Sequence, residues 1–171
     1  MENNTCCGCS RPDLPWAGRG TNLDISGCRF SLYPMDSNFV PIILGALEKT
    51  DTSAVWSQSD ALSTVYRGRL PYVVDAVEGL FVNAWQPTVH MALEGQFSNM
   101  GVSDYIDRIA EVWHMAEDAG LNPTSVHYAT RINGDVQAVF DYLHAVCRHM
   151  EQTVPHYILH FTLSVNSPTA E

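Results

Sequence analysis

The chain has 171 residues, of which 46% are hydrophobic and 16% are charged, and this composition excludes the charge-rich, apolar-poor class of disordered chains. Nine Lys and Arg against nineteen Asp and Glu give a formal net charge of −10, which argues against nucleic acid or an anionic membrane as a partner. The N-terminal run MENNTCCGCSRPD lacks the apolar core of a secretory signal, and no apolar stretch is long enough for membrane insertion. We therefore expect a cytoplasmic protein.

Residues 1–27 carry Gly, Pro, Asn and Ser without apolar periodicity, which predicts a flexible leader. Three of the five cysteines, Cys6, Cys7 and Cys9, lie within it. This single cluster lacks the second pair of ligands that a structural zinc site needs, so we favour an incidental leader over a soft-metal or redox site.

From residue 28 the pattern changes to strands and helices. The run CRFSLYPM alternates in polarity and predicts a strand that stops near Pro34. After it we expect a helix that ends near residue 50, strands over 54–58 and 62–69, a helix over 70–85 and a strand over 89–98. The order βαββαβ is the ferredoxin-like arrangement, in which two helices cover one face of an antiparallel sheet.

A similar order resumes after Met100, with a helix over 104–119, a strand over 125–132, a helix over 135–152 and a strand over 156–165. Identical residues recur at an offset of 62 positions: Ser63, Tyr66, Arg69, Val74, Ala76 and Val77 correspond to Ser125, Tyr128, Arg131, Val136, Ala138 and Val139. At an offset of 66, His90, Leu93 and Ser98 correspond to His156, Leu159 and Ser164. We predict an α+β protein of tandem ferredoxin-like units over residues 28–99 and 100–168, followed by a tail over 169–171.

The second unit has no counterpart of CRFSLYPM. A missing central strand would leave backbone hydrogen-bonding groups unpaired. Because QFSNMGVSDYI resembles RFSLYPMDSNFV, the strand that ends at Ser98 could close the first unit and also open the second. A strand from another copy of the chain is the alternative.

Side chains alternate across a strand, so each unit presents one face rich in hydroxyls, amides, imidazoles and arginines. A half-solvated sheet is normally polar outside, and that reading stays open. The recurrence of Ser, Arg and His at matching positions of the two units favours a ligand-binding surface. We interpret Tyr66 and Tyr128 as packed core residues. Arg131 could contact a ligand or pair with a carboxylate such as Glu94.

Motifs for catalysis are absent: the chain has no Gly-rich phosphate loop, no G-x-S-x-G and no H-E-x-x-H. His156 and His160 share a strand face but should lie about 13 Å apart, too far to bind one metal ion. We read Asp141 as part of a solvated helix face and His144 as a helix-surface residue. We therefore predict no catalytic residues, no metal ion and no cofactor.

Four runs, CRFSLYPMDSNFVPII, STVYRGR, SVHYATRINGD and EQTVPHYILHFTLSVNSP, resemble the YkoF family of thiamin- and hydroxymethylpyrimidine-binding proteins over most of residues 28–168. The resemblance implies tandem ferredoxin-like units, a homodimer, and binding of thiamin or hydroxymethylpyrimidine without catalysis. It also implies a link to vitamin uptake or salvage, with transport components as possible partners. The chain departs from the family because the linker and opening strand of its second unit are missing.

An aminopyrimidine needs donors and acceptors along its edge and an apolar or aromatic wall, which Ser, Thr, Asn and Gln beside Tyr can provide. The positive thiazolium of thiamin suits an acidic chain. The candidate contacts are Ser31, Tyr33, Ser63, Gln96 and Ser98 in the first unit, which we favour because it is complete, and Ser125, His127, Thr162, Ser164 and Asn166 in the second.

Two other functions remain open. The polar faces could pack on another sheet in a ligand-free dimerisation or regulatory module. An enzyme could use His90 or His156 as a general base on a small heteroaromatic compound, although neither has a carboxylate or nucleophile partner at a recognisable spacing.

Overall fold

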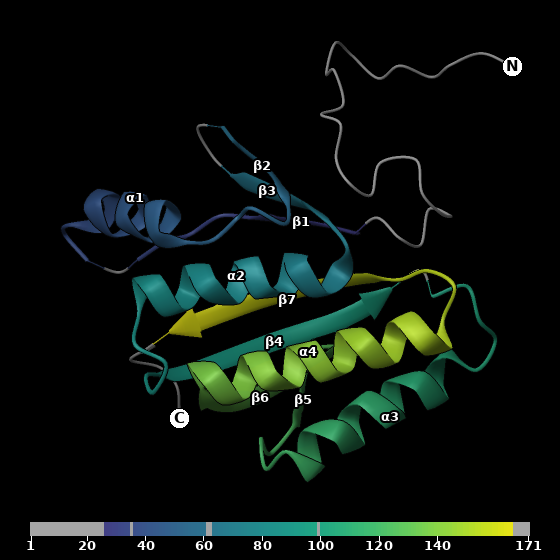
Figure 1. Cartoon of the computed structure of the whole chain (residues 1–171). Coiled ribbons are helices and arrows are strands. Elements are labelled where there is room, and N and C mark those ends of the chain that lie inside the picture. The colour runs from purple at the N-terminus through teal and green to yellow at the C-terminus, as the bar shows by residue number, and fades with distance from the viewer. Residues whose placement is uncertain (1–25, 35, 61–62, 99, 166–171) are drawn as a thin grey trace, which may run out of the picture.

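The computed structural model describes residues 26–34, 36–60, 63–98 and 100–165 (Figure 1). Its elements in chain order are β1 (Ser26–Phe30), α1 (Phe39–Lys49), β2 (Trp56–Ser59), β3 (Thr64–Gly68), α2 (Leu70–Ala84), β4 (His90–Ser98), α3 (Tyr105–Asp118), β5 (Thr124–Val126), β6 (Ala129–Asp135), α4 (Val136–Thr153) and β7 (Ile158–Val165). The predicted α+β class, with strands and helices ordered in two units of roughly βαββαβ pattern, is confirmed. None of the helices in these ranges is long and apolar enough to cross a membrane.

The strands form two antiparallel sheets, one ordered β1-β3-β2 and the other β5-β6-β4-β7. Strand β4 lies between β6 and β7, and Leu93 is opposite Ile132 on one side and Leu163 on the other. The strand that ends at Ser98 therefore belongs to the sheet of the second unit, which agrees with one of the two alternatives that the sequence left open. The expectation that it also closes the first unit is wrong, because β4 does not pair with β1. The unit boundary at residues 99–100 stays a prediction.

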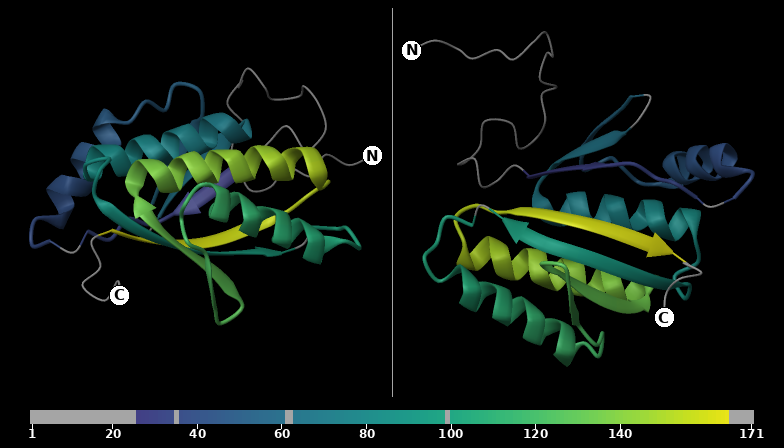
Figure 2. Two further views of the ribbon diagram at one scale, coloured as in Figure 1. Left: turned by 90° about the horizontal axis from the view of Figure 1, so that it is seen from below. Right: turned by 180° about the vertical axis from the view of Figure 1, so that it is seen from behind.

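Helices α2 and α4 lie side by side over the two sheets. Helix α2 packs on β1 and β3, α4 packs on β4 and β6, and the two helices contact each other. Figure 2 shows that the opposite face of β4 and β7 is free of helices. A continuous hydrophobic core runs through both units and includes Tyr66, Leu93, Ile132 and Phe140. Tyr66 has no exposed surface, which confirms it as a core residue.

Local sequence explains where the two central helices begin. Pro71 is tolerated in the first turn of α2, where its missing N–H has no partner in any helix. Asp135 caps α4, because its carboxylate accepts a hydrogen bond from the Ala138 backbone N–H at 2.7 Å. The observed ranges of α2 and α4 agree with the expected ones to within one residue at each end.

The strand expected over residues 125–132 is instead a hairpin. His127 and Tyr128 both have positive φ, 45° and 71°, and reverse the chain so that Val126 lies opposite Ala129. Two consecutive positive φ values are typical of the type I′ turn, whose twist matches that of paired strands. The three residues of β5 supply the second strand of this unit. The interpretation of Tyr128 as a core residue is wrong, because the turn leaves it fully exposed.

Candidate ligand-binding site

A cavity of about 90 Å³ lies between the helix-covered face of the β5-β6-β4-β7 sheet and helices α3 and α4. We call it the sheet cavity. It is lined by Leu93, Gly95, Gln96, Phe97, Ile109, Val112, Tyr128, Thr130, Ile132, Tyr142, Leu143, Val146 and Leu159. Concave, mostly apolar sites with a few polar groups are typical of small-molecule binding.

Strand alternation builds the floor of the sheet cavity. Leu93, Gly95 and Phe97 lie on the helix-covered face of β4, and the missing side chain of Gly95 leaves room for Leu93 and Leu159 to pack closely over the strand. A Cβ atom at Gly95 would lie 3.2 Å from Leu93 Cδ2 and 3.6 Å from Leu159 Cδ1. A glycine inside a strand weakens pairing but admits a ligand or another chain segment. The backbone of Gly95 thus lines the sheet cavity next to Leu93 and Leu159, where a larger side chain would have to displace them.

The polar side chains that line the sheet cavity are few and uncharged. The Tyr142 hydroxyl donates a hydrogen bond to the Val112 carbonyl at 3.2 Å, which ties α4 to α3. Burial raises the pKa of Tyr142 to about 12, so the phenol stays protonated at neutral pH. Thr130 adds a hydroxyl from β6, and Tyr128 adds an exposed aromatic ring from the turn. The cavity thus offers an apolar slot with aromatic and hydroxyl groups.

Four predicted contacts, Gln96, Ser98, Thr162 and Ser164, share the polar face of the second sheet. Strand pairing places Glu94 opposite Thr162 and Gln96 opposite His160, so these side chains leave the sheet on the side away from the helices. Gln96 is exposed on this face and is also among the residues that border the sheet cavity.

Arg131 also lies on this polar face, and its Nε donates to Glu94 Oε1 at 2.7 Å. This pair confirms the structural alternative for Arg131. It also means that the recurrence of Arg between the two units does not by itself mark a ligand contact.

The other predicted contacts are scattered. Ser31, Tyr33 and Ser63 belong to the first sheet or its end, so the first-unit group is split between two sheets. Ser63 accepts a hydrogen bond from Arg29 Nε at 2.9 Å, and Tyr33 is 78% exposed. In the second unit, His127 lies in the turn.

A single strand over residues 125–132 would place Ser125 and Arg131 on the same face, because side chains alternate along a strand. The hairpin places Ser125 opposite Thr130 and Arg131 opposite Thr124, so Ser125 and Arg131 lie on opposite faces of the sheet. Asn166 lies outside the described residues.

Sequence reasoning missed the sheet cavity because its walls come from positions with the pattern of core residues. Leu93, Ile132 and Leu143 are each less than 5% exposed. The one available signal was Gly95, which interrupts the inward series of β4 with a residue that packs nothing.

These features define a class: an α+β protein of two tandem units, with a small apolar cavity under one antiparallel sheet. The model of the YKOF-related family matches residues 25–99 and 99–170. A Bacillus subtilis (strain 168) protein with the name "Putative HMP/thiamine-binding protein YkoF" is 33% identical over 184 residues, covering 85% of this chain and 92% of that protein. The chain belongs to the YKOF-related family.

The 184 aligned positions outnumber the 171 residues of the chain, so the alignment includes positions that this chain lacks. A crystal structure from Thermotoga maritima, described as a "putative thiamine biosynthesis/salvage protein", has 14% sequence identity and a TM-score of 0.40. The match covers 44% of this chain and 82% of the Thermotoga maritima chain.

Proposed function

We propose that the protein binds thiamin or its hydroxymethylpyrimidine precursor without chemical turnover, in support of vitamin uptake or salvage. The observation that carries the proposal is the 33% identity to a relative that is named for binding these compounds. A cytoplasmic location, transport components as partners and the ten candidate contacts stay predictions of the sequence.

The sheet cavity is the site that this proposal favours. Pockets for drug-sized ligands usually measure roughly 300–1,000 Å³, whereas the sheet cavity measures about 90 Å³. The enclosed space therefore suits one flat ring rather than the whole of thiamin. The pyrimidine would enter the slot, and the rest of the vitamin would remain outside near Tyr128 and Gln96.

The lining of the sheet cavity supports binding over catalysis. Within the described part of the chain, none of its lining residues is Asp, Glu, His, Lys or Cys, the usual general acids, bases and nucleophiles. Its tyrosine with a raised pKa, Tyr142, keeps its proton at neutral pH and already donates it to Val112. The net charge of −10 also favours a cationic thiazolium over a competing anion.

Calorimetric titration of the full chain with thiamin, its phosphates and free hydroxymethylpyrimidine tests the function. Binding of at least one compound without product formation is expected. A folded protein that binds none of them would refute the proposal.

Gly95→Val tests the position of the site, because the added methyl groups would fill the sheet cavity. We expect binding to fall by at least about tenfold, the change that a loss of 1.4 kcal/mol produces. Ala92→Val is the matched control, since it adds the same kind of bulk on the opposite face of the same strand, opposite Ser164. If Gly95→Val disturbs folding by circular dichroism, Gly95→Ala replaces it. Equal binding by the Gly95 and Ala92 variants would place the ligand elsewhere.

A further inference from the structure

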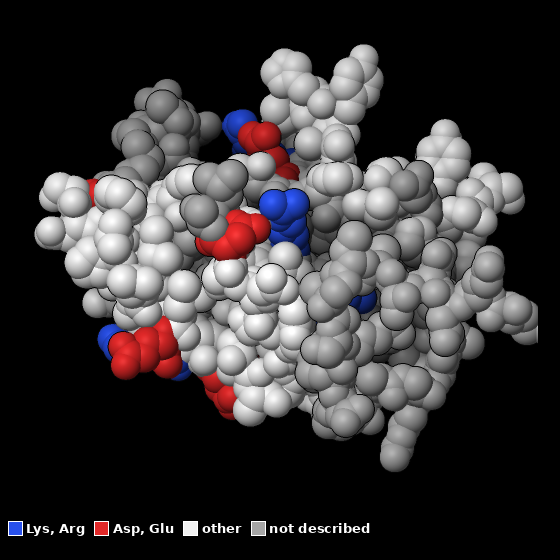
Figure 3. All heavy atoms as spheres, turned by 90° about the horizontal axis from the view of Figure 1, so that it is seen from above, with Lys and Arg blue, Asp and Glu red and all other residues white. Residues whose placement is uncertain are grey.

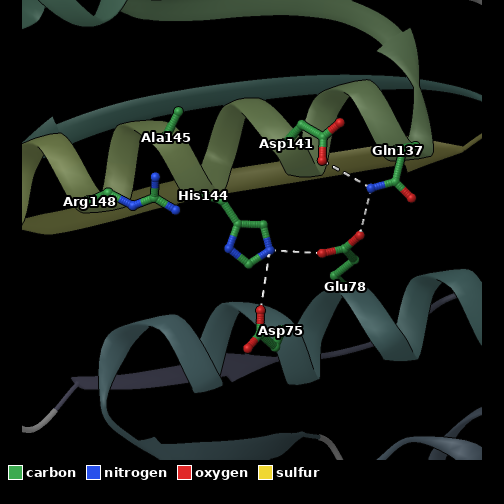
Figure 4. A pocket seen from close by; sticks show the side chains of 7 residues that line it. All are labelled: Asp75, Glu78, Gln137, Asp141, His144, Ala145 and Arg148. Atoms are coloured by element: carbon green, nitrogen blue, oxygen red, sulfur yellow. Dashed lines mark hydrogen bonds and ion pairs between the residues drawn. The ribbon is translucent and has the colours of Figure 1, made fainter.

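A second hollow, distinct from the sheet cavity, lies where α2 and α4 pack together. It is a polar depression of about 380 Å³, and Figure 4 shows the side chains that converge on it from the two helices. Asp75 and Glu78 come from α2, and Gln137, Asp141 and His144 come from α4. Residues three or four positions apart lie on the same side of a helix, so each helix presents these side chains as one stripe.

Three of these residues form a compact group that we call the interhelix cluster: Asp75, Glu78 and His144. Each offers one ligand atom, and the three atoms lie within 4.8 Å of one another. His144 Nε2 is 2.8 Å from Glu78 Oε2 and 3.6 Å from Asp75 Oδ1. His144 and Glu78 are about one-fifth exposed, whereas Asp75 is 61% exposed.

The Nε2 atom of His144 faces two carboxylates, of which only Glu78 is within hydrogen-bonding distance. A neutral imidazole has at most one hydrogen on Nε2, so it can serve one carboxylate fully but not two. A cation at that point would contact all three groups. Atoms that bind one ion at about 2.1 Å are separated by about 3.0 Å in octahedral and about 3.4 Å in tetrahedral geometry. The two distances from His144 Nε2, 2.8 and 3.6 Å, bracket these values, and the ligand oxygens of Asp75 and Glu78 lie within 4.8 Å of each other.

Neighbouring groups hold the cluster in place. Gln137 Nε2 donates to Glu78 Oε1 at 2.9 Å and to Asp141 Oδ1 at 3.0 Å, as Figure 4 shows. Glu78 therefore keeps its other oxygen directed at His144. Hydrogen bonds of this kind to ligand carboxylates orient metal sites and strengthen them.

We propose that the interhelix cluster binds a divalent transition-metal ion such as Zn²⁺ through Asp75, Glu78 and His144. An imidazole nitrogen with carboxylate oxygens suits Zn²⁺ and similar ions better than Ca²⁺ or Mg²⁺, which prefer oxygen alone. The depression is open to solvent, so water can fill the remaining coordination positions. Three carboxylates line it, against Arg148 and the imidazole, and their charge favours a cation.

The ion would bridge α2, which packs on the first sheet, to α4, which packs on the second. This role is independent of vitamin binding, because the cluster shares no residue with the sheet cavity. Sequence reasoning did not find the cluster because its members are far apart in the chain and come from different units.

Zn²⁺ titration of the full chain by calorimetry tests the site. Cys6, Cys7 and Cys9 are replaced by Ser in all samples, since their thiolates would also bind Zn²⁺. We expect one ion per chain and a rise in the unfolding temperature with added Zn²⁺. His144→Ala should weaken binding by more than about tenfold, because loss of even an outer partner of a metal ligand costs 10- to 100-fold.

His114→Ala is the matched control, because His114 also pairs with a glutamate on a helix but lies 71% exposed outside the cluster. It should leave Zn²⁺ binding unchanged. If His144→Ala fails to fold, Asp75→Asn is used instead, because it keeps the size of an exposed ligand side chain. It should also weaken Zn²⁺ binding by more than about tenfold. Absence of Zn²⁺ binding, or binding that neither cluster variant weakens, would overturn the proposal.

Discussion

At the scale of single residues, burial controls several titratable groups of the core. The pKa of the Cys28 thiol is raised to about 11, first by burial and then by the nearby Cys147, and burial raises that of Cys147 to about 11. Burial also raises the pKa of Tyr66. These groups are neutral at physiological pH and resist ionisation in the folded chain. The two thiols are therefore poor nucleophiles, which agrees with a core role.

The raised pKa of Tyr142 should make the free energy of unfolding depend on pH. Its pKa is about 12 in the folded chain against an ordinary value of 10, so the folded state holds the proton more tightly. Its contribution to stability is complete below pH 10 and is lost as the pH rises towards 12. Tyr142→Phe should therefore reduce the loss of unfolding free energy over that interval, measured by urea unfolding at several pH values. An unchanged pH dependence in this variant would show that Tyr142 does not titrate with folding.

At the scale of elements, the β5–β6 turn departs from its sequence preference. Positive φ is costly for residues with a Cβ atom, and type I′ turns favour Asn followed by Gly, yet His127 and Tyr128 occupy the two positions. Tyr128 borders the sheet cavity, so this costly turn places an aromatic ring beside the proposed ligand site.

Tyr128→Gly should separate stability from binding. Relief of the positive φ should raise the free energy of unfolding by about 1 kcal/mol, whereas loss of the aromatic ring should weaken ligand binding. Tyr128→Phe is the control, since it keeps both the aromatic ring and the positive φ, and it should leave stability and binding unchanged. Thermal unfolding and calorimetry on both variants measure the two effects. Unchanged binding by Tyr128→Gly would remove Tyr128 from the site.

The helices could be predicted from the sequence, whereas the β5–β6 turn and the partners of β4 could not. The apolar stripe of α2 and Pro71 predict its range almost to the residue, because helix signals are local. The hairpin at residues 127–128 was missed because the turn contains no Gly or Asn. The partners of β4 could not be settled either, since strand pairing joins distant segments and the same pattern suits both sheets. The sheet cavity was missed because the residues that line it have the same apolar pattern as buried core residues.

At the scale of the whole molecule, the homodimer stays a prediction. The exposed apolar side chains of α1, Phe39, Val40 and Leu44, are the kind of surface that association covers. Figure 3 shows a face on which charged side chains form only small groups among uncharged atoms.

The placement of β4 leads to a test by dissection. Helix α2 packs on the first sheet, but β4, which follows it, lies in the middle of the second. Separate expression of residues 26–98 and 100–165 should therefore leave fragment 100–165 unfolded, because its sheet loses β4, and fragment 26–98 with β4 unpaired. Mixing them should restore the circular dichroism of the intact chain. A folded monomeric fragment 100–165 would contradict this expectation.

A cut within the loop at residues 85–89 should behave differently, since it leaves β5, β6, β4 and β7 on one polypeptide. The chain changes sheets at this loop, and the sequence repeat does not mark it. Duplicated proteins are often treated as two modules that evolution can exchange at the repeat boundary. Here the boundary between the repeats, near residue 99, differs from the point at residues 85–89 where the chain passes from the first sheet to the second. Recombination at residue 99 would therefore transfer the second unit without β4, the strand that lies between β6 and β7.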